Sequence, residues 1–179
     1  MDLGHQLPAA EVAIIVGGLF NIPPVKINQE LKTFKTLPHR LELIGRFKGI
    51  TFINDSLATI PQAAIHALKV LGPQVSTLIA GGFDRGVDYS PLSQAIPKTD
   101  LNTLILLPTT GDKIKQGLKP KPNLRIFSVN SLADAVKLAF QHTPEGKVCL
   151  MSPASASFNM FRDYEQRGNE FKRLVASLA

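Results

Sequence analysis

Three short segments of this chain hold polar and aromatic residues of the kinds that line ligand-binding loops. They are residues 54–61 (NDSLATIP), 81–89 (GGFDRGVDY) and 152–158 (SPASASF), the last followed by 161–168 (FRDYEQRG). Together they supply hydroxyls, arginines, aromatic rings and backbone amides close to predicted helix starts. Arginine binds a carboxylate or phosphate through paired hydrogen bonds, and a helix N-terminus adds partial positive charge. The segments therefore predict a site for a small carboxylate or phosphate.

Each segment also has a simpler explanation. In the first, Asp55 or Ser56 can cap the following helix; in the second, the glycine pair can form a plain turn and Arg85 can be a solvated surface residue. Three serines of the third segment can be capping residues around its proline: Ser152, Ser155 and Ser157. Such caps and turns are common, so no single segment decides between the explanations.

The hydrophobic pattern predicts an α/β fold. Two helices come first, an apolar one over 9–20 and an amphipathic one over 25–34. Strands over 41–47 and 50–53, joined by Lys48-Gly49, predict a hairpin or a strand with a tight connection. Further strands are predicted at 77–80, 102–107, 124–129 and 147–151, and further helices at 63–71, 90–96, 111–118, 132–142 and 161–178. Apolar strands that alternate with helices are typical of a Rossmann-like, mostly parallel sheet with helices on both faces.

In such a sheet, ligands bind at the carboxyl ends of the strands. Three of the predicted strands end at Ile53, Ala80 and Met151, immediately before the three polar segments. We therefore expect all three segments to open on the same edge of the sheet. That shared position favours a binding site over three unrelated caps and turns.

The composition narrows the function classes. Hydrophobic residues make up 44% and charged residues 19% of the 179 residues, which is enough apolar material for a packed core. The net charge of +6 favours anionic ligands, but the basic residues are scattered and aromatic stacking residues are few, so no nucleic-acid partner is expected. The apolar run 12–20 is too short to span a bilayer, so no membrane partner is expected either. The single cysteine, Cys149, is interpreted as a buried small hydrophobe, which fits a cytoplasmic location.

Several catalytic and metal-binding signatures are absent from the sequence. It has no G-x-x-x-x-G-K-[ST] phosphate loop, no G-x-G-x-x-G fingerprint and no G-x-S-x-G elbow. The widely spaced histidines and the single cysteine make no zinc pattern. Structural or surface roles are expected for all four histidines: His5, His39, His66 and His142. The residues alone therefore predict a binding site without metal ligands or phosphoryl-transfer machinery.

Four sequence blocks together resemble the C-terminal part of the bacterial Mur ligases, and among these the D-glutamate-adding branch. The blocks are LPHR-L-E (37–42), NDS-L-AT (54–59), GGFDRG (81–86) and SPASAS (152–157) with EQRGNEF (165–171). They occur in the family's order and spacing, and the likeness runs from about Gly4 to the end. The GGFDRG block favours the D-glutamate branch over other Mur or folylpolyglutamate ligases.

The resemblance implies a three-domain ligase of peptidoglycan synthesis that uses ATP and magnesium. Residues 37–179 resemble its amino-acid-binding C-terminal domain, and residues 1–36 resemble the last helices of its central ATP-binding domain. In this family ATP converts the carboxylate of UDP-N-acetylmuramoyl-L-alanine to an acyl phosphate, which the amine of D-glutamate attacks. The phosphate loop and magnesium ligands would lie in the rest of the central domain. The chain alone, without a catalytic residue of its own, is not expected to turn over.

The resemblance also implies roles for individual residues. Arg40 and Asp55 would contact the nucleotide, with the guanidinium suited to phosphate and the carboxylate to ribose hydroxyls. The D-glutamate pocket would be formed by Thr59, Arg85, Ser157, Phe158 and Tyr164, with Arg85 on the side-chain carboxylate.

The chain departs from the family pattern at a few positions. Leu57 stands where many relatives have Lys; other relatives have an apolar residue there together with an Asp-Arg pair, as in Asp84-Arg85, and Arg85 then carries the cationic role. Gln6 and Ala9 stand where the family has two asparagines that help to bind adenine, which weakens the nucleotide prediction. Pro8 and Ala9 leave one alternative open, a standalone Rossmann-like binding or regulatory module that has lost ligase activity.

Overall fold

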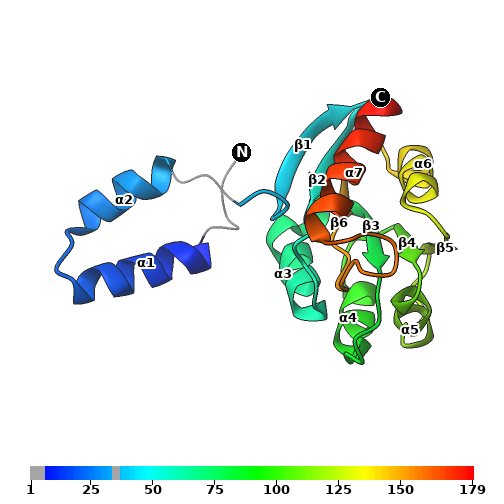
Figure 1. Cartoon of the computed structure of the whole chain (residues 1–179), viewed down its shortest axis with the longest axis horizontal. Coiled ribbons are helices and arrows are strands. Elements are labelled where there is room, and N and C mark those ends of the chain that lie inside the picture. Colours follow the sequence, from blue (N-terminus) through cyan, green and yellow to red (C-terminus); the bar gives the residue numbers. More distant parts are fainter. Residues whose placement is uncertain (1–6, 34–36) are drawn as a thin grey trace. The chain divides into compact units, whose positions relative to one another are not determined.

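A computed structural model of the chain describes residues 7–33 and 37–179. The chain divides into two compact units, Met1–Leu37 and Pro38–Ala179 (Figure 1). In the first unit the described residues form helices α1 (Leu7–Leu19) and α2 (Pro24–Thr33). Both helices agree with the prediction from the hydrophobic pattern, except that residue 34 lies outside the described part of the chain.

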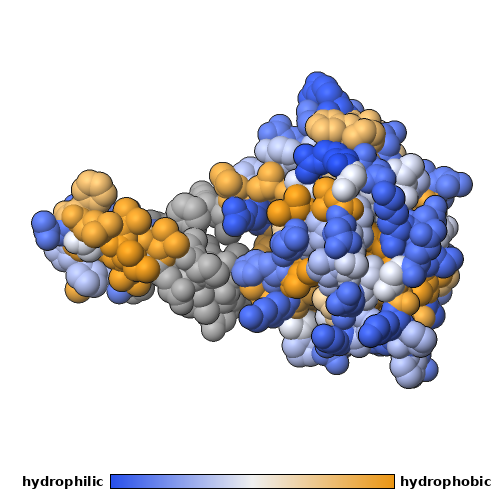
Figure 2. Space-filling view, turned by 90° about the horizontal axis from the view of Figure 1, so that it is seen from below, coloured by the Kyte–Doolittle hydropathy of each residue, from blue (hydrophilic) through white to orange (hydrophobic). Residues whose placement is uncertain are grey.

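Much of the apolar surface of the helix pair is exposed. Leu19 and Phe20 are 78% and 75% exposed, whereas Ile27 packs over Gly17 between the helices. Figure 2 shows this hydrophobic surface on the helix pair, in contrast to the largely hydrophilic face of the second unit. A helix that is apolar on all sides is typically buried in a larger protein.

The second unit contains a six-stranded sheet in the order β1-β2-β6-β3-β4-β5. Strands β1 (Glu42–Phe47) and β2 (Ile50–Asn54) form an antiparallel hairpin. Its turn residues Lys48 and Gly49 both have positive φ, as a two-residue turn between twisted strands requires. All other neighbours pair in parallel: β3 (Val75–Gly81), β4 (Thr103–Leu107), β5 (Arg125–Ser128) and β6 (Val148–Met151).

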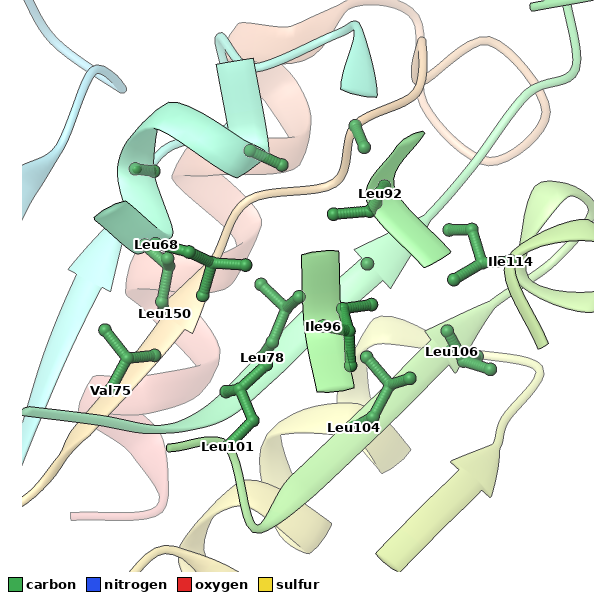
Figure 3. Packing of buried hydrophobic residues seen from close by; sticks show 14 of the residues in the cluster. Leu68, Val75, Leu78, Leu92, Ile96, Leu101, Leu104, Leu106, Ile114 and Leu150 are labelled. Atoms are coloured by element: carbon green, nitrogen blue, oxygen red, sulfur yellow. The ribbon is translucent and has the colours of Figure 1, made fainter. Parts of the chain in front are cut away.

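Helices cover both faces of this sheet because alternate strand residues point to opposite sides. Leu78, Leu104 and Leu150 belong to a core with α3 (Pro61–Leu71), α4 (Ser90–Ala95) and α5 (Thr110–Gln116) (Figure 3). Ile79 and Ile105 belong to the opposite core, with α6 (Leu132–His142) and α7 (Tyr164–Ser177). The predicted α/β fold, with two preceding helices, is confirmed.

The last helix differs from its predicted range of 161–178. It begins at Tyr164, because Asp163 has an extended backbone and its side chain accepts a hydrogen bond from the amide of Gln166. An aspartate in that position is a strong N-cap, so residues 161–163 belong to the preceding loop.

Cys149 is fully buried, and burial raises the pKa of its thiol, as expected of a core hydrophobe rather than a nucleophile. Within residues 7–33 and 37–179, no helix has the length and apolar character needed to cross a bilayer.

Leu104→Ala tests whether the α3–α5 side of the sheet forms a tightly packed core. Leu104 is fully buried, so its truncation should lower the free energy of unfolding by about 2–5 kcal/mol through lost burial and a residual cavity. Leu43→Ala, at a 51% exposed position on β1, is the matched control and should cost less than about 1 kcal/mol. Urea denaturation measures both, and equal losses would contradict this packing.

Candidate functional site

The three polar segments lie together at the carboxyl edge of the sheet, as predicted. Strand β6 runs between β2 and β3, so Met151 is level with Asn54 on one side and with Ile79 on the other. Backbone hydrogen bonds then join the loops: the Asp55 amide donates to the Met151 carbonyl at 2.8 Å, and the Gly81 amide donates to the Pro153 carbonyl at 2.8 Å. The sheet order therefore brings together loops 54–61, 81–89 and 152–158.

Asp55 is buried at the centre of this edge, only 4% exposed. Its carboxylate accepts hydrogen bonds from the Ser152 hydroxyl at 2.6 Å and from the Leu41 amide at 3.1 Å. Burial raises the pKa of Asp55 to about 6, although these two hydrogen bonds and the nearby charge of Arg40 favour the ionised form. Asp55 is thus a carboxylate whose charge is suppressed by its surroundings below neutral pH.

The helix-capping explanation for Asp55 and Ser56 is wrong. Helix α3 has Ile60 as its N-cap, with no side-chain hydrogen bond, and begins at Pro61, whose missing amide needs no acceptor. The Ser56 hydroxyl instead donates to the carbonyl of Tyr164 at 2.7 Å. The polar side chains of this loop therefore serve contacts across the fold.

A cleft of about 470 Å³ opens beside loop 54–61. Arg40, Asp55 and Thr59 line it together, so the structure unites the two predicted nucleotide contacts with one predicted glutamate contact. Leu57 also lines the cleft, and the first turns of α3 supply Gln62 and His66.

Arg85 reaches loop 54–61 from the second segment. It is exposed, and its guanidinium Nη2 donates to the Thr59 carbonyl at 3.3 Å. Asp84 forms its ion pair with Lys113, Nζ to Oδ2 at 2.6 Å, rather than with its neighbour Arg85. The explanation of Arg85 as a purely solvated side chain is therefore incomplete.

Of the predicted glutamate-pocket residues only Thr59 lines the cleft, so the other three, like Arg85, lie outside its lining. Phe158 is 61% exposed and packs edge-on against Phe83, with 6.1 Å between ring centroids. Ser157 is buried, and its carbonyl accepts hydrogen bonds from the amides that follow it in a turn. The ring of Tyr164 lies edge-on to His39, 6.1 Å between centroids.

Arg167 is the residue whose role sequence reasoning missed. It lies on α7, is only 1% exposed, and donates hydrogen bonds to loops 54–61 and 152–158. Burial lowers the pKa of its guanidinium to about 10, so it stays charged at neutral pH. The available signal was its spacing, since Arg167 shares the buried stripe of α7 with Phe171 and Leu174.

The glycine pair is more than a turn. Gly82 has φ +155°, and a Cβ there would collide with the Ala156 carbonyl and lie 3.2 Å from Nη1 of Arg167. Its amide donates to the Thr110 hydroxyl at 2.9 Å, which is hydrogen-bonded to the Ser155 hydroxyl at 2.7 Å. The absence of a side chain lets loops 81–89 and 152–158 make contact.

The Ser152 and Ser155 side chains do not act as the helix caps that the simpler explanation requires. Ser155 is also hydrogen-bonded to the hydroxyl of Tyr89, at 2.8 Å, and Ser152 donates to Asp55. Both side chains therefore link separate loops to one another.

A second polar cluster fixes the segment that carries Arg40. His39 is buried with positive φ, and its Nδ1 lies 2.9 Å from the Asn54 amide nitrogen. Burial lowers the pKa of His39, which favours the neutral ring that accepts this hydrogen bond. The Glu42 carboxylate accepts a hydrogen bond from the Asn54 side-chain amide and forms an ion pair with Lys172, with 3.0 Å between Nζ and Oε1. Because Lys172 lies on α7, this helix also anchors the segment.

No group of three or more potential metal ligands occurs among the described residues. His39 has the structural role just given, and His142 stacks on Phe127 with 4.6 Å between centroids. His66 is exposed at the cleft, and His5 lies outside the described residues.

Comparison with known proteins identifies the family. Residues 39–155 match the family model described as "Mur ligase, glutamate ligase domain". The chain belongs to this family. The match covers well over half of the chain and includes the blocks at Arg40, Asp55 and Arg85.

Curated relatives extend the likeness across both units of the chain. A UDP-N-acetylmuramoylalanine--D-glutamate ligase of Aquifex aeolicus is 38% identical over 171 residues, covering 96% of this chain and 40% of the relative. A UDP-N-acetylmuramoyl-L-alanine--L-glutamate ligase of Salinispora tropica is 40% identical over 146 residues, covering 82% and 32%. The chain thus spans about two fifths or less of the length of these relatives.

Solved structures agree on the fold. The UDP-N-acetylmuramate-alanine ligase MurC of Thermotoga maritima superposes with a TM-score of 0.65 at 16% identity, covering 98% of this chain and 38% of that one. A pseudomurein peptide ligase type C of Methanothermus fervidus gives 0.65 at 15% identity, covering 97% and 35%. At such low identity the likeness concerns the fold alone.

The burial of Asp55 predicts an unusual titration. Its carboxyl should titrate with a midpoint of about 6, which NMR of the side-chain carbon measures directly. Asp88 is the internal reference: its hydrogen bonds with Ser90 lower its pKa, so it should titrate below the ordinary range. Ser152→Ala should raise the Asp55 midpoint further, because it removes a hydrogen bond to the charged form.

The same shift has a consequence for stability. The folded state holds the proton of the Asp55 carboxyl more tightly than the unfolded chain does. The stabilisation that this protonated carboxyl gives is therefore complete below about pH 4 and is lost as pH rises through about 6. As pH rises from about 4 to about 6, the free energy of unfolding of Asp55→Asn should therefore increase by about 1–3 kcal/mol relative to that of the unmutated chain. A titration midpoint near 4, or a difference independent of pH, would contradict the burial of this carboxylate.

Gly82→Ala tests the close contact between the loops. The added methyl meets the Ala156 carbonyl, so the variant should lose about 2–3 kcal/mol of unfolding free energy. Gly86→Ala is the matched control: its φ of +74° adds strain, but nothing lies within 4 Å of the new Cβ, and a loss of about 1 kcal/mol is expected. Equal losses in urea denaturation would show that the loop contact is dispensable.

Proposed function

We propose that this chain is the amino-acid-binding part of an ATP-dependent ligase that joins D-glutamate to UDP-N-acetylmuramoyl-L-alanine in peptidoglycan synthesis. The observation that carries the proposal is the hydrogen bond from Arg85 to Thr59 beside the cleft that holds Arg40 and Asp55. This contact joins two residues of the predicted glutamate site, and one of them, Thr59, shares the cleft with the two predicted nucleotide contacts in a chain of the Mur ligase family. The names of relatives such as the Aquifex aeolicus enzyme support the choice of reaction.

The nucleotide side of the site suits a sugar phosphate. Arg40 is exposed at the cleft and supplies a guanidinium for phosphate oxygens. Asp55, ionised above about pH 6, supplies a carboxylate that can accept hydrogen bonds from ribose hydroxyls. Bound ATP with Mg²⁺ would supply the phosphoryl group that activates the acceptor's carboxylate as an acyl phosphate.

The amino-acid side of the site positions a nucleophile. Arg85 would bind the side-chain carboxylate of glutamate, and Thr59 and Ser157 would add hydrogen bonds, with Phe158 and Tyr164 shaping the wall. Holding the dicarboxylate at two ends aims its amine in one direction, which is catalysis by positioning. The chemistry still needs the activated carboxylate, so this chain alone should bind glutamate without turnover.

The helix pair fits the same proposal. We infer that residues 1–36 are the end of the central ATP-binding domain, because α1 is apolar on all sides and exposes large side chains such as Ile15 and Leu19. The rest of that domain would cover this surface and supply the phosphate loop and magnesium ligands. Gln6 lies outside the described residues, and the side chain of Ala9 is likewise not described, so their predicted effect on adenine binding stays a prediction. A cytoplasmic location, where ATP is available, belongs to the proposal.

Titration of this chain with glutamate tests the substrate. D-glutamate should shift the NMR signals of the Thr59, Arg85 and Ser157 loops, and L-glutamate should shift them less. Both enantiomers are needed because relatives are named for each of them. Shifts with L-glutamate alone would move the proposal to the L enantiomer of the added amino acid, and shifts with neither would count against a preformed glutamate site.

Arg85→Ala in the same titration tests the key contact. Losing a charge-assisted hydrogen bond of about 1.5–3 kcal/mol should weaken D-glutamate binding about 10- to 100-fold. Arg46→Ala, an equal loss of charge on the β1–β2 hairpin, should leave binding unchanged. Unaltered binding in Arg85→Ala would remove Arg85 from the pocket.

A further inference from the structure

The guanidinium of Arg167 connects two of the three site loops through all three of its nitrogens. Nε donates to the Ser56 hydroxyl at 3.0 Å and Nη2 to the Ser56 carbonyl at 2.8 Å. Nη1 donates to the Ser155 carbonyl at 2.9 Å and to the Ala156 carbonyl at 3.2 Å. The planar fork therefore holds loop 54–61 on one side and loop 152–158 on the other.

The third loop meets the same group. The Phe83 amide donates to the Ala156 carbonyl at 2.8 Å, so one oxygen receives both Arg167 and loop 81–89. The backbone of Gly82 packs directly beside the guanidinium. The loops that carry Thr59, Arg85 and Ser157 thus converge on one buried side chain.

Stability alone does not account for this arrangement. Among the described residues, every ion pair lies elsewhere, so Arg167 is buried against neutral oxygens with no carboxylate beside it. Burying a cation is costly, and an apolar side chain on this stripe of α7 would avoid the cost. What an apolar side chain cannot do is fix three carbonyls and a hydroxyl of two different loops at set distances.

We propose that Arg167 is a positioning residue of the amino-acid site, which sets the relative positions of the loops that carry Thr59, Arg85 and Ser157. The ligand part of this inference rests on the proposed function, because it takes glutamate as the substrate. Arg167 acts through the loops, since its guanidinium is occupied by their backbone oxygens and is shielded from solvent.

The test compares Arg167→Gln and Arg167→Lys with Arg173→Gln. Arg173 lies on the same helix, is exposed and pairs with Glu170, so its variant matches the loss of charge without touching the loops. Amide hydrogen exchange of Phe83 reports the loop contact, and the Leu104 and Ile105 amides on β4 report the sheet. D-glutamate titration reports the affinity of the folded protein.

We expect Arg167→Gln to speed exchange at Phe83 at least tenfold with the β4 amides unchanged, and to weaken D-glutamate binding at least tenfold. Arg167→Lys should resemble it, because an ammonium cannot reproduce the fork, and Arg173→Gln should match the unmutated chain. If Arg167→Gln does not fold, Ser56→Ala removes the acceptor of Nε and should show the same local loosening in milder form.

The positioning role is overturned if Phe83 keeps its protection in the folded variants, if the sheet and the loops loosen together, or if lysine restores both measurements. Absence of any glutamate shift in the unmutated chain would instead remove the substrate of the proposed function. The exchange measurements would still decide the role of Arg167 in that case.

Discussion

The carboxyl edge of this domain depends on one buried cation, the Arg167 guanidinium, which has no carboxylate partner among residues 7–33 and 37–179. A guanidinium in a dry environment must have its N–H groups satisfied, and Arg167 finds backbone oxygens of Ser56, Ser155 and Ala156. Those oxygens converge only if the loops after β2 and β6 keep a fixed separation. The need to satisfy one side chain thus constrains loops that are far apart in sequence.

The neighbouring features follow from that constraint. Gly82 has room for no side chain because a Cβ there would collide with the Ala156 carbonyl and lie 3.2 Å from the Arg167 guanidinium. Beside it, the Thr110 hydroxyl accepts a hydrogen bond from the Gly82 amide and is hydrogen-bonded to the Ser155 hydroxyl. Asp55, buried next to Ser152, is less readily ionised for the same reason that Arg167 loses some of its basicity: water is excluded.

The sequence was sufficient for the fold because periodicity is a local signal. The short apolar runs in β3 and β4 and the spacing in α6 identify the elements, and the strand ends locate the site loops. The partners of Asp55, Ser155 and Arg167 were not predictable, because each is set by a residue from a distant segment. The simpler explanation of Asp55 or Ser56 as a helix cap failed for the same reason: local propensity favours a cap, but the tertiary contacts of these side chains take precedence.

The position of β6 also has a consequence for how the chain acquires its structure. Strand Val148–Met151 is the last strand in sequence, yet it lies between β2 and β3 near the middle of the sheet. Until β6 has been synthesised, β2 and β3 each keep one unpaired edge. Contacts between segments that are far apart in the sequence also form slowly. Arg167 and the loop at Ser155 follow β6 in the chain. During synthesis the carboxyl edge is therefore completed last, so the proposed site exists only in molecules whose last strand and final helix have folded.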